Sequence, residues 1–186
     1  FRRVLFRSAL LMDQSEGRIR TINGEADLEI TEPGPSRTLV TEAMILAGAV
    51  VADVGRRHGL ALPYRSQLPA ALPSPTELAA LPPGPVRHAA LKRCLSRGIT
   101  GTEPANHFSL GLSAYVQATS PIRRYGDLVV QRQLAAHLSG ATPRDSTSLM
   151  ELLQEIESGV RQAAAISRED QRHWQQIWLE IGRAHV

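Results

Sequence analysis

The chain has 186 residues, which suits one globular domain with a single core, and it holds no run of about 18 uncharged apolar residues that would predict a membrane span. Its formal net charge of +3 is too small to indicate nucleic-acid binding by itself. The one cysteine, Cys94, has no partner for an internal disulfide or a zinc site, so we expect a buried small apolar residue and a cytoplasmic protein.

The first part of the chain predicts a small β-sheet. Asn23-Gly24 is a strong signal for a two-residue hairpin, and it separates predicted strands at 18–22 and 25–31. A further short strand is predicted at 10–13. Pro33, Gly34 and Pro35 then end the sheet.

A helix is predicted from residue 36 to 58, with Gly59 as its stop. Its basis is a set of apolar residues at helical spacing: Leu39, Val40, Ala43, Met44, Ala47, Val50, Val51 and Val54. An extended piece at 62–65 follows. Ser74 and Glu77 form a capping box that opens a helix at 76–81.

The second half of the chain predicts mainly helix. Residues 82–85 are interpreted as a turn before a helix at 86–96, and residues 108–116 as a strand. A helix at 125–138 ends at Gly140, and a capping box at 148–151 begins a long amphipathic helix that reaches about residue 179. The expected fold class is therefore α+β, with a β-hairpin region followed by mainly helical segments.

Both termini are compatible with one DNA sequence read on opposite strands. Residues 3–8 can be encoded as CGTGTGCTCTTCCGATCT, and the reverse complement, read two bases in, encodes residues 181–185 and begins a valine codon. A ligated sequencing adapter leaves this pattern, so we interpret 1–8 and 181–186 as non-native scars. On this interpretation residues 9–180 are an internal slice of a longer protein.

The most informative segment is residues 115–132, YVQATSPIRRYGDLVVQR. Thr119 and Ser120 offer hydroxyls, Pro121 interrupts regular structure, and Arg123 and Arg124 stand just before the predicted helix. Such a turn can direct hydroxyl groups, backbone N–H groups and a guanidinium at one phosphate. Taken alone, such a turn is usually a helix cap with solvated charges.

The whole string resembles the TSPIRRY-x-D signature of the RNB catalytic domain in the RNase II/RNase R exoribonuclease family. Residues 39–47 (LVTEAMILA) are similar to the family's LVEE-x-M-x-LAN helix, and 62–67 resemble its YR-containing strand. Residues 107–112 resemble its HFGLGL stretch, and 172–174 its closing helix. The resemblance covers residues 9–180, so we expect the C-terminal half of the catalytic domain.

Three departures from the family pattern resemble its cyanobacterial and plant-organelle branch. Gly48 replaces the usual asparagine, whereas Gln67 and Gln117 replace usual histidines. Contacts that depend on the missing side chains are therefore not expected in this chain.

The resemblance implies processive hydrolysis that releases nucleoside 5′-monophosphates from the 3′ end of single-stranded RNA, with magnesium, by a monomeric enzyme. The family's metal site is a cluster of aspartates, because paired metals need closely spaced oxygen ligands. The aspartates of this chain are scattered, and we expect them in caps, turns or on the surface: Asp13, Asp27, Asp53, Asp127, Asp145 and Asp170. We therefore expect the ligands upstream, and the chain alone to be inactive.

The resemblance assigns the catalytic residues Arg123 and Glu42. Arg123 is expected to neutralise charge that builds on the scissile phosphate. Glu42 is expected near the ribose of the terminal nucleotide, where it accepts hydrogen bonds from hydroxyl groups. The alternative for Glu42 is a buried helix glutamate paired with an arginine.

The expected RNA-binding residues are Thr119, Ser120, Arg124, Tyr125, Arg65 and His107. Arg124 either binds a neighbouring phosphate or is a solvated charge. Tyr125 stacks on RNA or packs in the protein, and His107 binds the RNA backbone or caps a turn. Arg65 contacts RNA or neutralises Glu42.

Two other classes of function stay open. One is a non-catalytic RNA-binding module derived from the same fold, which an absent upstream aspartate cluster would favour. The other is a helical adaptor in which residues 119–125 are merely a turn. A P-loop phosphotransferase is excluded, because the sequence has no G-x-x-x-x-G-K-[ST] motif.

Overall fold

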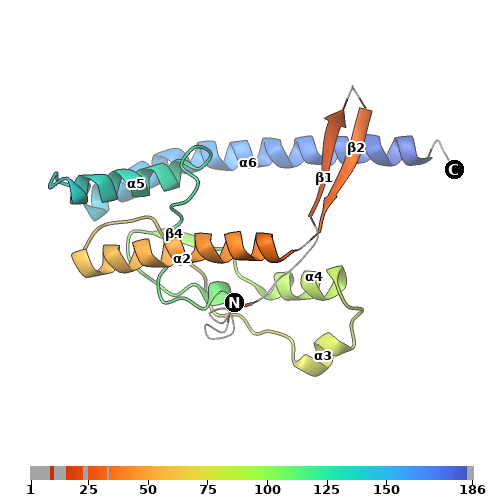
Figure 1. The fold of residues 1–186 in the computed structure, drawn as a ribbon, viewed down its shortest axis with the longest axis horizontal. Coiled ribbons are helices and arrows are strands. Elements are labelled where there is room, and N and C mark those ends of the chain that lie inside the picture. The colour runs from red at the N-terminus through yellow and green to blue at the C-terminus, as the bar shows by residue number, and fades with distance from the viewer. Residues whose placement is uncertain (1–8, 11–15, 23–24, 33, 184–186) are drawn as a thin grey trace. The chain divides into compact units, whose positions relative to one another are not determined.

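The computed structural model describes residues 9–10, 16–22, 25–32 and 34–183 (Figure 1). These residues fall into two compact units. One contains residues 9–10 and 35–153, and the other contains the hairpin residues before 35 together with residues 154–183. The mixture of helices and short antiparallel strands confirms the expected α+β class.

The hairpin consists of β1 (Glu16–Ile22) and β2 (Glu25–Thr31), which pair antiparallel with Ile19 opposite Leu28. Both predicted strands are confirmed, and β1 begins two residues earlier than expected. The predicted strand at 10–13 lies mostly outside the described residues. Leu10 is not in a strand, although its N–H donates a hydrogen bond to the carbonyl oxygen of Ser109.

Helix α2 (Pro35–His58) confirms the prediction at both ends, and Gly59 follows with a φ of +61°. Its buried residues are Gly48, Ala52 and Gly55, which recur at i, i+4 and i+7 on one face. The apolar residues that predicted the helix lie only partly against the core, since Val51 packs against it whereas Leu39 and Val50 are exposed. By length and composition α2 could also cross a membrane, a test that core helices of soluble proteins pass as well.

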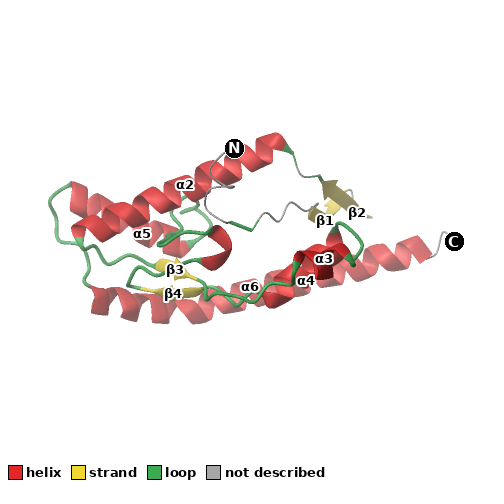
Figure 2. Cartoon of the chain, turned by 90° about the horizontal axis from the view of Figure 1, so that it is seen from below, coloured by secondary structure: helices red, strands yellow, loops and turns green. Residues whose placement is uncertain are grey.

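The middle of the chain forms two short strands and two short helices. Strands β3 (Tyr64–Ser66) and β4 (Ile99–Gly101) pair antiparallel, and Figure 2 shows them side by side. The predicted helices appear as α3 (Pro75–Ala79) and α4 (Pro85–Cys94).

Two local predictions for this region can be compared with the structure. The capping box is confirmed, because the hydroxyl of Ser74 accepts from the N–H of Glu77 and the carboxylate of Glu77 accepts from the N–H of Ser74. Cys94 is half-buried rather than buried, and its Sγ donates to the carbonyl oxygen of Ala90.

The predicted strand at 108–116 is wrong. A 3-10 turn, η1 (Phe108–Leu110), begins the segment, and Gly111 follows with a φ of +59°. The chain then turns back, and the N–H of His107 donates to the carbonyl oxygen of Leu112 at 2.8 Å. A left-handed residue inside the apolar run therefore breaks the strand, because extended backbone needs a negative φ.

Helix α5 (Tyr125–Leu138) has the predicted bounds, and Gly140 has a φ of +73°. The long helix α6 (Ser146–Arg183) is confirmed, but its capping was predicted wrongly. Asp145 caps the helix by accepting from the N–H of Ser148 at 2.7 Å. The hydroxyl of Ser148 instead accepts from the guanidinium of Arg144.

The core of the larger unit joins α2, the β3 strand with its lead-in, the segment before the TSPIRRY string and α5. Its buried members are Ala52, Leu60, Leu62, Tyr64, Val116, Ala118 and Val130. Each large apolar side chain buried in this way stabilises the fold by about 1.5–3 kcal/mol. The core thus holds residues 116–118 and the first half of α5 together, on either side of the TSPIRRY turn.

The predicted scars at 1–8 and 181–186 stay a prediction. Residues 1–8 and 184–186 lie outside the described residues, and α6 continues through Arg183.

Candidate functional site

The candidate site is the turn at residues 119–124, which precedes α5. The carbonyl oxygen of Ser120 accepts hydrogen bonds from the N–H groups of Arg123 at 3.3 Å and Arg124 at 3.0 Å. Arg124 is extended and is the residue before the helix, which begins at Tyr125. Pro121 within this turn cannot supply an N–H for a helix, so the backbone stays compact but non-helical until Arg124.

A buried carboxylate holds this turn. Asp127 lies in the first turn of α5 with 1% of its surface exposed. Its Oδ2 accepts from the backbone N–H of Ser120 at 2.8 Å and from the guanidinium of Arg124 at 2.7 Å. The expectation that Asp127 serves in a cap or turn is therefore met by a contact that crosses the turn.

Arg124 was predicted either to bind a neighbouring phosphate or to be a solvated charge. Its side chain is 29% exposed and forms an ion pair with Asp127, so it is not a freely solvated charge. Its Nε is buried without a hydrogen-bond partner in the structure. Whether it also binds phosphate stays a prediction.

Arg123 differs from its neighbour in being exposed. Its guanidinium donates one long hydrogen bond, 3.4 Å, to the hydroxyl of Ser120. Ile122 beside it is fully exposed, and Thr119 and Tyr125 are exposed as well. The turn thus presents a cation and a hydroxyl group to solvent, as a phosphate site requires.

Tyr115 connects this turn to the other candidate residues, and the sequence analysis did not single it out. Burial raises the pKa of its hydroxyl, and the charges of Arg124, Asp127 and Arg65 act on it more weakly. Its ring meets that of His107 edge-on, with the ring centres 5.7 Å apart. The adjacent position of Tyr115 in the YVQATSP string is the signal that would have suggested it.

Arg65 reaches this neighbourhood from β3. Its N–H donates to the carbonyl oxygen of Tyr115 at 2.8 Å, and its guanidinium donates to the hydroxyl of Thr100 on β4. The guanidinium lies across Gly98, where an added Cβ would be 2.9 Å from its nitrogen. Whether Arg65 contacts RNA or neutralises Glu42 stays a prediction.

His107 is a neutral imidazole near neutral pH. Burial lowers its pKa from 6.5, and the positive charge of Arg65 lowers it further. Its Nδ1 is buried without a hydrogen-bond partner in the structure. The side chain does not cap the η1 turn that follows, so the prediction of a capping role is wrong.

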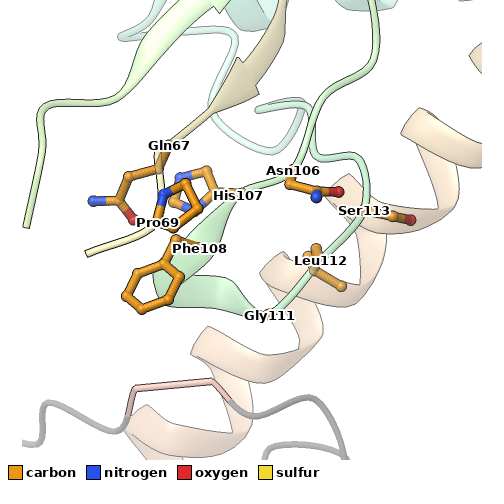
Figure 3. Close-up of a pocket in the computed structure, with 8 residues that line it drawn as sticks. All are labelled: Gln67, Pro69, Asn106, His107, Phe108, Gly111, Leu112 and Ser113. Atoms are coloured by element: carbon orange, nitrogen blue, oxygen red, sulfur yellow. The ribbon is translucent and has the colours of Figure 1, made fainter. Parts of the chain in front are cut away.

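A pocket of about 330 Å³ lies beside His107 (Figure 3). Its lining residues are Gln67, Pro69, Asn106, His107, Phe108, Gly111, Leu112 and Ser113. Gln67, which replaces a histidine of the family pattern, donates to the carbonyl oxygen of Ser96 and accepts from the N–H of Ser109, both at 2.9 Å. The glutamine therefore fixes the wall of the pocket by joining two loops.

Glu42 lies in the N-terminal half of α2 and is half-buried. Helical geometry places it one turn before Leu46 and about 120° around the helix axis from Gly48. A Cβ atom at Gly48 would clash with the carbonyl oxygen of Val116 and the ring of Tyr115. Helix α2 therefore passes close to the segment that leads into the turn. The part of Glu42 at the ribose stays a prediction.

The part of the chain that the structure describes holds no group of three or more histidine, cysteine, aspartate or glutamate side chains that would bind a metal ion. Asp127, the acidic residue nearest the turn, already accepts two hydrogen bonds through one oxygen. The described residues thus do not fit a magnesium site, and its expected ligands are not among them.

Comparison with known proteins gives consistent results. The family model described as RNB domain matches residues 6–140. An uncharacterized ribonuclease of Synechocystis sp. is 40% identical over 163 residues, which is 87% of this chain and 24% of the relative. The chloroplastic and mitochondrial ribonuclease II of Arabidopsis thaliana is 37% identical over 102 residues, 55% of this chain and 13% of the relative.

A solved structure has the same fold. Mycoplasma genitalium RNase R, in complex with ribose-methylated single-stranded RNA, superposes with a TM-score of 0.74 at 21% identity. The match covers 94% of this chain and 33% of that protein. The matched region thus spans 24% of the Synechocystis ribonuclease, 13% of the Arabidopsis ribonuclease II and 33% of the RNase R chain.

Proposed function

The chain belongs to the RNB domain family, and from this membership we propose that it is part of an exoribonuclease that releases nucleoside 5′-monophosphates processively from the 3′ end of single-stranded RNA. The curated relatives are named ribonucleases, and the RNase R structure was solved with single-stranded RNA. Magnesium dependence, a monomeric state and a cytoplasmic location belong to the same proposal and rest on the family resemblance.

One observation carries the proposal: Arg123 is exposed on a turn whose backbone N–H at Ser120 donates a hydrogen bond to the buried carboxylate of Asp127. When the terminal phosphodiester is hydrolysed, the oxygen of a water molecule forms a bond to phosphorus. The bond between phosphorus and the 3′ oxygen of the preceding nucleotide breaks. Negative charge builds on the phosphoryl oxygens as this happens. A fixed guanidinium that meets this charge stabilises the transition state more than the bound substrate.

The other candidate residues have supporting parts in the proposal. Thr119 and Ser120 offer hydroxyl hydrogen bonds to the phosphate, and Tyr125 offers an exposed ring for a base. Glu42 accepts hydrogen bonds from the ribose hydroxyls, which distinguish RNA from DNA. The metal ligands that activate water are expected from upstream sequence, so we propose that this chain alone does not hydrolyse RNA.

The proposal is tested in the complete polypeptide by Arg123→Ala. We expect kcat to fall by about two to three powers of ten while RNA affinity falls far less, because the guanidinium acts mainly in the transition state. Arg132→Ala is the matched control, since Arg132 is exposed on α5 beyond the turn. Equal losses in kcat and affinity would make Arg123 a ground-state contact.

A second measurement uses the present chain. Labelled single-stranded RNA is incubated with the chain and magnesium, and nucleotide products are separated by thin-layer chromatography. Release of mononucleotides above a metal-free control would contradict the proposed inactivity. A complete polypeptide that binds RNA but does not cleave it would favour the non-catalytic RNA-binding module.

A further inference from the structure

Asp127 is the one charged side chain that is buried among the described residues. Moving a carboxylate out of water costs several kcal/mol unless hydrogen bonds and an opposite charge compensate for it. Both kinds of compensation come from the turn, since the N–H of Ser120 and the guanidinium of Arg124 bind the same oxygen. The burial of Asp127 therefore depends on the shape of the turn, and the shape of the turn depends on Asp127.

The two partners of Asp127 stand on either side of Arg123. Ser120 begins the turn and Arg124 ends it, so one carboxylate oxygen fixes both ends of the segment between them. The side chains in between, Ile122 and Arg123, are left on the exposed side. The two arginines therefore differ in surroundings: Arg124 is ion-paired at 2.7 Å, and Arg123 has one long hydrogen bond.

We propose that Asp127 and Arg124 form a latch that positions Arg123, and that Arg124 is a positioning residue and not a phosphate ligand. This inference rests on the proposed function, in which Arg123 contacts the phosphate. Because the latch pairs one positive with one negative charge, the net positive charge that the turn offers to RNA is that of Arg123 alone. The backbone at Arg123 is thus held in place from both sides. Arg124 adds no counter-ion release.

The test measures binding of a fluorescent single-stranded RNA by this chain at several salt concentrations, using anisotropy. The variants are Arg123→Ala, Asp127→Asn and the double variant, because asparagine keeps the size of the side chain and removes its charge. We expect Arg123→Ala to weaken binding about tenfold and to reduce the salt slope by about 0.7, the value for one phosphate contact on a single strand. In the Asp127→Asn background the same substitution should weaken binding less than about twofold, because the two residues act together.

Arg124→Gln removes the other member of the latch. It replaces Asp127→Asn in the test if urea unfolding shows that Asp127→Asn lowers stability too far. We expect Arg124→Gln to weaken binding and to reduce the salt slope about as much as Arg123→Ala does, because Arg123 then loses its phosphate contact, and we expect a further Arg123→Ala to be nearly silent. Hydrogen exchange at the Ser120 amide should accelerate in Asp127→Asn, while exchange at Leu149, whose N–H binds Asp145 elsewhere in the unit, should not change.

The outcomes separate the latch from the proposed function. Additive losses from Arg123→Ala and Asp127→Asn would overturn the latch and leave the proposed function standing. A salt slope that falls further in the Arg123→Ala, Arg124→Gln double variant than in either single variant would also overturn it, because Arg124 would then be a phosphate ligand in its own right. If Arg123→Ala left RNA binding and hydrolysis unchanged, the proposed function and the latch would both fail.

Discussion

The two faces of α2 have opposite surroundings. The inner face carries Gly48, Ala52 and Gly55, which are buried against the segment that leads to the TSPIRRY turn and against the lead-in to β3. The outer face carries Leu39 and Leu46, which are 64% and 43% exposed. The small residues are thus inside and the large apolar residues outside, the reverse of the usual pattern for a helix that borders a core.

This difference shows that a helix face can be buried for two reasons: small residues let another backbone come close, or large apolar side chains pack in a core. On the inner face, glycine lets the backbone of α2 lie against Tyr115 and Tyr64, because any Cβ at Gly48 or Gly55 would clash there. On the outer face the apolar side chains lack such cover in the described residues. The inner face therefore positions the turn.

The largest effect is expected on the inner face, from Gly48→Ala. Alanine is the better helix former by about 1 kcal/mol, but its Cβ would clash with the carbonyl oxygen of Val116, which is backbone and cannot rotate away. Overpacking of this kind costs about 1–3 kcal/mol, so after the gain in helix propensity we expect a net loss of about 1–2 kcal/mol in the free energy of unfolding. Urea unfolding followed by circular dichroism measures it.

Gly159→Ala is the control for Gly48→Ala. Gly159 lies in the interior of α6, and an added Cβ would meet no atom within 4 Å. We expect this substitution to raise stability or leave it unchanged, because helix propensity acts without a clash. If Gly48→Ala behaved like Gly159→Ala, the inner face would be loosely packed and the comparison would be wrong.

Sequence reasoning succeeded where the signal was local. Asn23-Gly24 identified the hairpin, and both Gly59 and Gly140 marked helix ends with a positive φ. It failed for β4 and for residues 108–116, because β4 exists through its pairing with β3 and Gly111 turns the chain back. These features depend on distant residues and on one backbone conformation that apolar spacing does not reveal.

The candidate site was predictable to a similar extent. The TSPIRRY string identified the turn, but not the different surroundings of its two arginines. That difference follows from a hydrogen bond between residues seven apart, Ser120 and Asp127, which no helical or strand periodicity predicts. In the same way, apolar spacing indicated helix α2 but not its inner face, because glycine gives no hydrophobic signal.

A smaller effect on the free energy of unfolding is expected from His107 when pH falls. The folded protein keeps the imidazole neutral because burial and Arg65 lower its pKa, whereas the unfolded chain takes up a proton near pH 6.5. Between pH 7.5 and 5.5 the unfolded state therefore binds more protons, and the free energy of unfolding should decrease as pH falls. Urea titrations at pH 7.5, 6.5 and 5.5 measure this decrease.

His107→Gln removes the titrating group and should make the decrease smaller. His173→Gln, on α6 outside the larger unit, provides the matched control for the loss of a histidine side chain. If the pH dependence stayed the same in His107→Gln, the surroundings of the imidazole would not disfavour its charge. Water would then reach the ring in the folded protein.

The smallest effect on stability is expected on the outer face, from Leu46→Gln. Leu46 is 43% exposed, so its replacement removes less buried area than a core substitution does, and substitutions at the surface change the free energy of unfolding by about 0.5 kcal/mol or less. Urea unfolding followed by circular dichroism measures the change. A loss of more than about 1 kcal/mol would mean that Leu46 is packed in solution, and the two faces of α2 would then differ in residue size alone and not in burial.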